Sequence, residues 1–120
     1  MSTPSARVIR RWFSVTDRAE KRRLVAYARR LLDEHPTLAP TAFPLVADAA
    51  HLAEVRLPAL RREHDSALRR RRQTQARRAR RGLAASSRAL RALLQELRED
   101  AGRHQSDDFD LALALRGVRS

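Results

Sequence analysis

Residues 69–97 read RRRRQTQARRARRGLAASSRALRALLQEL, and this stretch decides what kind of protein the chain forms. Its first thirteen positions hold eight arginines and no acidic residue, whereas its second half repeats leucine every seven residues. A run of like charge this dense repels itself and cannot be buried, so it needs a polyanionic partner or open solvent. The leucines that follow instead mark a helix with one apolar face.

The composition of the 120-residue chain favours an all-α protein. Ala, Leu, Arg and Glu are strong helix formers and are abundant, while β-branched residues and glycine are scarce. A hydrophobic content of 42% is enough for the core of one domain. There is no cysteine, which excludes disulfides and thiolate zinc sites and is compatible with a reducing cytoplasm. No apolar run approaches the ~20 residues that a membrane span needs.

The expected location is cytoplasmic, but residues 1–13 leave one alternative open. They hold three arginines, no acidic residue and apolar residues at helical spacing. This pattern is typical of a mitochondrial presequence, and it is equally typical of a first core helix, which we favour.

Start and stop signals divide the first part of the chain into a small helical bundle, residues 1–57. A first helix is expected over residues 4–13, where a proline follows a threonine. A second is expected over residues 17–35, capped by its first residue and ended by a proline. A third is expected over residues 44–57, where the next residue, Pro58, predicts a break or a kink.

Residues 58–82 are expected to form a long basic helix that leaves the bundle near Pro58. From Arg69 to Gly82 the only apolar side chains are Ala76 and Ala79, so arginines point in every direction around a helix. A helix that is basic all round has no face to dock on its own domain, so we expect it to project or to stay unfolded until bound. Most of the chain's formal net charge of +12 lies in residues 56–91, the middle third of the sequence.

Residues 83–120 are expected to form a Leu-rich helix followed by an acidic and apolar segment. The seven-residue spacing leaves two arrangements open. One is a core helix that packs back on the bundle. The other is a short coiled coil that forms a homodimer through Leu83, Leu90, Leu93 and Leu97.

The acidic C-terminal segment also has two interpretations. Residues 107–111, Asp-Asp-Phe-Asp-Leu, resemble the acidic-aromatic docking modules of viral transcriptional activators. The simpler interpretation, which we favour, is a last helix capped by Ser106. In either case the acids could shield the basic segment when its partner is absent.

The arginine cluster predicts binding to DNA or RNA through the phosphate backbone. Guanidinium groups bind phosphate with two hydrogen bonds, and each neutralised phosphate releases counterions. Only Gln73 and Gln75 within the cluster could read a base, so sequence-specific contacts are not expected. The alternative is an adaptor or assembly protein that docks on an acidic protein surface or a ribonucleoprotein. The candidate contact residues are Arg61, Arg62, Arg69, Arg70, Arg71, Arg72, Arg77, Arg78, Arg80, Arg81, Arg88 and Arg91.

The order of the basic region and the leucines resembles the leucine-zipper DNA-binding proteins over residues 69–97. The sequence departs from that family because its basic region contains no asparagine and because Gly82 stands at the junction. A continuous forked helix is therefore not implied.

Two Arg–His pairs have the spacing found in helical ribonucleases of the HEPN type. They are Arg30 with His35 and Arg98 with His104. With 25 arginines in the chain such pairs arise by chance, and the four histidines are too widely spread for a metal site. The sequence therefore predicts a non-enzymatic protein without a metal or cofactor.

Overall fold

The structure is a computed structural model that describes the backbone of residues 4–119 and the side chains of residues 4–103. All regular elements in this part of the chain are helical, so the expected all-α class is confirmed. A 3-10 turn, η1, precedes α3, and a π-helix, η2, joins α3 to α4. The elements are α1 (Ala6–Arg10), α2 (Arg18–Glu34), η1 (Pro40–Ala42), α3 (Phe43–His51), η2 (Leu52–Arg56), α4 (Leu57–Arg69) and α5 (Gln73–Arg119).

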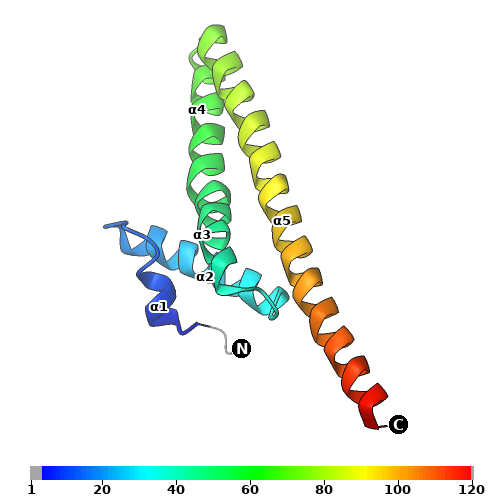
Figure 1. Cartoon of the computed structure of the whole chain (residues 1–120). Coiled ribbons are helices and arrows are strands. Elements are labelled where there is room, and N and C mark those ends of the chain that lie inside the picture. The colour runs from blue at the N-terminus through cyan, green and yellow to red at the C-terminus, as the bar shows by residue number, and fades with distance from the viewer. Residues whose placement is uncertain (1–3, 120) are drawn as a thin grey trace.

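The core lies where the N-terminal helices meet the middle of α5. The largest fully buried side chains come from four elements: Ile9 from α1, Leu24 from α2, Val46 from α3 and Leu97 from α5. Figure 1 shows α3, η2 and α4 following one another as one rod, with α5 returning antiparallel beside it. The molecule is therefore elongated, with principal extents of 73 × 28 × 16 Å.

Local signals place the ends of α2 where they were expected. The Asp17 carboxylate accepts hydrogen bonds from the backbone N–H groups of Ala19 and Glu20, at 2.8 and 3.1 Å. These bonds satisfy two of the donors that every helix N-terminus leaves unpaired. The first helix is shorter than expected, because Ser5 caps α1 and the helix ends at Arg10.

Of the break or kink predicted at Pro58, the break does not occur, because α3, η2 and α4 follow one another without a loop. A proline has no N–H and its ring clashes with the carbonyl group four residues earlier, here that of Glu54. Glu54 lies in η2, where the N–H of Leu57 bonds to the carbonyl oxygen of Leu52 instead of a residue four positions back. The wider π turn accommodates the proline ring, so α3 continues into α4.

The loop after α2 ties α5 to the N-terminal helices. The Thr37 hydroxyl donates to the carbonyl oxygen of Ala101 at 2.9 Å, and the N–H of Ala39 donates to the Asp100 carboxylate at 3.2 Å. Arg103 lies 3.6 Å from the same carboxylate. These bonds fix the position of α5 along its axis relative to the body.

The Leu-rich segment packs back on the bundle. Leu97 is fully buried in the core, and Leu90 and Leu93 are partly buried against it. These side chains serve an intramolecular core, so a homodimer through them would require them to leave it. The backbone of α5 runs through Ser106 to Arg119 without the separate last helix that was expected to start there. The side chains of the acidic segment lie outside the described residues.

Candidate nucleic-acid interface

The arginine cluster forms the tip of a helical hairpin made by α4 and α5 (Figure 1). The chain reverses at residues 70–72 through a Schellman turn. In this turn the N–H of Arg71 bonds to the carbonyl oxygen of Leu68 at 3.1 Å and the N–H of Arg72 to that of Ala67 at 2.8 Å. Arg71 has a left-handed backbone with φ of 56°, which glycine usually occupies. The expected single basic helix is therefore two antiparallel helices.

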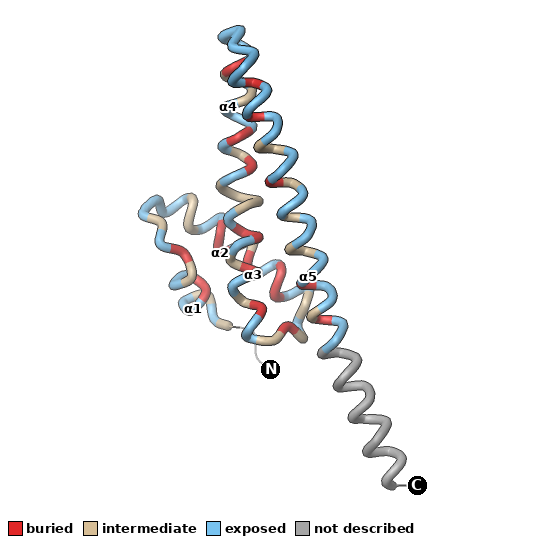
Figure 2. Tube along the Cα trace, turned by 45° about the horizontal axis from the view of Figure 1, so that its top comes forward, coloured by how far each residue is buried: buried red, intermediate tan, exposed pale blue. Residues whose placement is uncertain are grey.

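The prediction that this basic segment has no face to dock on was also wrong. Ala76 and Ala79, the two apolar residues between Arg69 and Gly82, are 4% and 1% exposed. Figure 2 shows buried positions of α5 on the side next to α4, and the packing of α4 against α5 accounts for the burial of these two alanines. Two alanines are enough because small side chains let two helix backbones approach closely.

The seam between the two helices extends the leucine spacing toward the tip. On α5 the buried and half-buried positions form two interleaved rows with seven-residue spacing. These rows are Ala76, Leu83, Leu90, Leu97 and Ala79, Ser86, Leu93. Close to the tip, a Cβ atom added at Gly82 would lie 3.0 Å from Leu60 Cδ2 on α4. On α5 the leucines thus form the part of the seam nearer the body, and mostly small residues form the part nearer the tip.

The solvent side of α5 carries a stripe of arginines. At 100° per residue, five exposed arginines fall within a sector about 100° wide that is turned away from the seam. The stripe is about 21 Å long, from the helical rise between its ends. We call this set the arginine stripe; its members are Arg77, Arg80, Arg81, Arg88 and Arg91.

All twelve candidate arginines are exposed, and none forms an ion pair within the part of the chain that the structure describes. Two acids, Glu63 and Asp65, lie among the arginines of α4; Asp65 is one turn from Arg61, Arg62 and Arg69, and its carboxylate contacts His64 at 3.5 Å. No acid lies on α5 before Glu96, about 24 Å along the helix from Arg80. The α5 side of the hairpin is therefore the more strongly positive.

The C-terminal acids lie still farther from the tip. Because α5 is continuous, residues 107–110 follow Arg81 by about 40 Å or more along the helix axis. Figure 1 places this end of α5 opposite the hairpin tip. The prediction that these acids shield the basic segment concerns side chains that lie outside the described residues.

Three of the four residues of the Arg–His pairs line one hollow, which the sequence did not predict. A hollow of about 170 Å³ between α2 and α5 is lined by Arg30, His35 and Arg98, with Tyr27 and Glu34 beside them. Arg30 lies 5.8 Å from the centre of the Tyr27 ring. Burial, followed by the nearby Glu54 carboxylate, raises the pKa of Tyr27, so this phenol keeps its proton at neutral pH. Among the described residues no hydrogen bond or ion pair links the two arginines to His35, and the side chain of His104 lies outside them.

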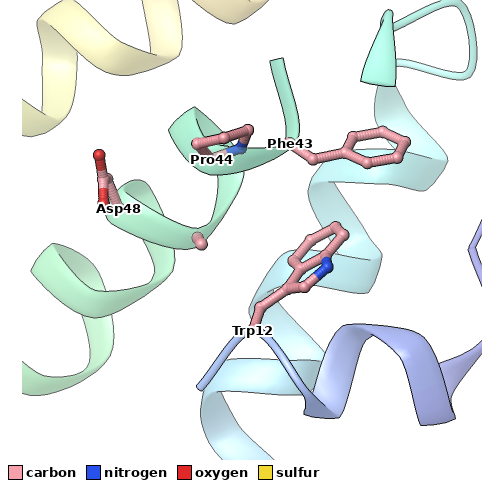
Figure 3. A pocket seen from close by; sticks show the side chains of 5 residues that line it. Trp12, Phe43, Pro44 and Asp48 are labelled. Carbon is pink, nitrogen blue, oxygen red and sulfur yellow. The ribbon is translucent and has the colours of Figure 1, made fainter. Parts of the chain in front are cut away.

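A second hollow, which is apolar, was not among the candidates either. Trp12 and Phe43 pack with ring centres 5.3 Å apart and planes tilted by 33°. With Pro44, Ala47 and Asp48 they line about 320 Å³ (Figure 3). Only the scarcity of aromatic residues could have drawn attention to this pair.

Comparison of the chain with models of protein families, with curated proteins and with solved structures finds no match. In the part of the chain that the structure describes, no helix is long and apolar enough to cross a membrane. The same residues contain no group of three or more His, Cys, Asp or Glu that could hold a metal ion. The function therefore has to be argued from the chemistry of the hairpin.

Proposed function

We propose that the α4–α5 hairpin binds DNA or RNA through the phosphate backbone and that the protein has no enzymatic activity of its own. The observation that carries the proposal is the arginine stripe: exposed, free of acids and held on one side of a packed helix. Residues 61–91 contain twelve arginines and two acidic residues, a net charge of +10. A surface with this excess of positive charge, whose arginines form no ion pair among the described residues, attracts a polyanion.

The dimensions of the stripe suit a nucleic-acid strand. Its length of about 21 Å corresponds to roughly six base pairs, at about 3.4 Å of rise per phosphate on one strand. Each guanidinium group can bind a phosphate with two parallel hydrogen bonds. The stripe can thus follow one strand without contact to the bases.

Recognition is expected to be independent of sequence. Gln73 and Gln75 are exposed in the first turn of α5, and they are the only side chains of the cluster suited to read a base edge. Backbone contacts determine position and affinity but carry no sequence information. Affinity should therefore be similar for duplexes of different sequence and should fall steeply with salt.

A charge-matched pair of variants tests the proposal. In one, Arg77, Arg81 and Arg88 are changed to glutamine. In the control, three exposed arginines outside the hairpin are changed in the same way: Arg23, Arg29 and Arg56. Binding to duplex DNA and to structured RNA is measured by fluorescence anisotropy over a range of salt concentrations. The slope of log affinity against log salt should shrink by about 2.7 for duplex DNA in the stripe variant, at about 0.9 per lost contact, and far less in the control.

Two results would refute the proposal. One is wild-type protein that binds no nucleic acid at low salt. The other is an equal loss in both variants, which would mean that only total charge matters. If nucleic acid does not bind but the hairpin arginines are needed to capture an acidic protein surface or ribonucleoprotein, the adaptor alternative replaces this function.

A further inference from the structure

A second group of cations surrounds a hollow at the side of the body, away from the hairpin. The hollow has a volume of about 410 Å³ and is lined by Arg10 of α1 and by Arg18, Lys21 and Arg22 of α2. No acidic side chain is among these lining residues. The volume lies within the range of pockets that take small molecules, about 300–1,000 Å³.

The fold holds these four side chains close together. Arg18, Lys21 and Arg22 are spaced i, i+3 and i+4, which places them on one face of α2. Arg10 comes from α1, which is fixed against α2 by the buried Ile9 and its neighbours. The hollow is thus built on two helices whose packing the core determines.

The three cations that α2 contributes lie near its N-terminus, where positive charge destabilises a helix. The N-terminus of a helix has a partial positive charge, so cations there are less stable than at the C-terminus. Arg18 lies in the first turn of α2, and Lys21 and Arg22 follow in the next. Asp17 and Glu20 offset part of this charge, but the Asp17 carboxylate is already bonded to two backbone N–H groups. No ion pair involves any of the four cations among the described residues.

From these observations we infer that this hollow is an anion site for a ligand with two or more closely spaced phosphates. Four cations match the charge of a short polyphosphate, and their hydrogen-bond donors suit phosphate oxygens. Two sources have this chemistry. One is a free polyphosphate group, as in a nucleoside triphosphate. The other is the backbone of a nucleic acid, and this second source rests on the proposed function.

The test compares Lys21→Gln/Arg22→Gln with the control Arg23→Gln/Arg29→Gln, which removes two charges from the same helix outside the hollow. Tripolyphosphate binding is measured by calorimetry, and binding to duplex DNA by anisotropy over a range of salt. Loss of about tenfold or more in tripolyphosphate affinity in the first variant alone supports a free polyphosphate as ligand. If wild type does not bind tripolyphosphate, a decrease of about 1.8 in the DNA salt slope in the first variant alone supports the nucleic-acid source.

Other outcomes overturn the inference. The first is a Lys21/Arg22 variant that behaves like its control in both assays. The second is an unfolding midpoint of this variant, measured without ligand, that is lower than that of wild type. If the four cations form a ligand site, removal of two repelling charges should leave the midpoint unchanged or raise it. The hairpin variant separates the two proposals: it should lose DNA affinity if the proposed function is right, and it should keep tripolyphosphate binding if a free polyphosphate is the ligand of the hollow.

Discussion

The two described glycines of α5 provide the sharpest test of how closely α4 and α5 pack. A Cβ atom at Gly102 would meet no atom within 4 Å, whereas one at Gly82 would lie 3.0 and 3.3 Å from the two Cδ atoms of Leu60. Both positions are within the same helix. The substitution of alanine at each should therefore have the same effect on helix propensity and a different effect on packing.

The expected magnitudes follow from this contrast. Alanine is more favourable than glycine inside a helix by about 0.8–1.0 kcal/mol, so Gly102→Ala should raise the free energy of unfolding by about that amount. At Gly82 the same gain is offset by displacement of Leu60, and overpacking costs about 1–3 kcal/mol. Gly82→Ala should thus give no gain or a loss of up to about 2 kcal/mol. For a chain of 120 residues, 1 kcal/mol corresponds to about 4 °C in the unfolding midpoint.

The assay is urea unfolding followed by circular dichroism, with a double-mutant cycle. In a Leu60→Ala background the Cδ atoms are absent, so Gly82→Ala should recover the full gain from helix propensity. Equal stabilisation by Gly82→Ala and Gly102→Ala in the wild-type background would refute the reasoning. It would mean that the two helices are farther apart at this point than the structure has them.

Three other substitutions test the hairpin and the core. Arg71→Gly should raise the free energy of unfolding in urea by up to about 1 kcal/mol, because glycine suits the left-handed backbone at this position. Arg71→Ala keeps the strain and should give no such gain, so equal effects of the two substitutions would contradict this reasoning. His64→Leu should raise the unfolding midpoint, because the Nε2 atom of His64 is buried without a hydrogen-bond partner among the described residues, and its removal should stabilise the fold by about 1 kcal/mol. A lower midpoint would disprove this. Leu97→Ala should lower the free energy of unfolding by about 2–5 kcal/mol, whereas Leu68→Ala should lower it far less, because the Leu68 side chain is 51% exposed. Similar losses in the two variants would argue against the observed core.

The parts of the fold that the sequence predicted depend on short-range signals. Asp17 can cap α2 because its side chain reaches amide groups only two and three residues away. Pro36 ends the same helix through its own backbone geometry. The all-α class follows from composition and periodicity, which do not depend on how the helices are arranged.

The hairpin could not be predicted in the same way. Its turn contains no glycine or proline, since Arg71 adopts the left-handed conformation without either. Gly82, which interrupted the leucine pattern in the sequence, lies in the middle of a helix at its closest approach to Leu60. The exposure of the candidate arginines followed from charge alone. Their grouping into a stripe followed from the burial of Ala76 and Ala79, which only tertiary packing determines.

The seam of the hairpin buries less apolar surface near the tip than near the body, so local stability should differ along the hairpin. Near the tip the seam consists of Ala67, Ala76 and Ala79, which bury little apolar area, whereas Leu97 is enclosed by the body. Backbone amides near residue 76 should therefore exchange with solvent through local openings that leave the amides near residue 97 protected. The helices are therefore expected to open locally near the tip, where residues 70–72 still join them, at a free energy below that of global unfolding. The part of the molecule that carries most of the positive charge is thus also the part whose shape adjusts most readily.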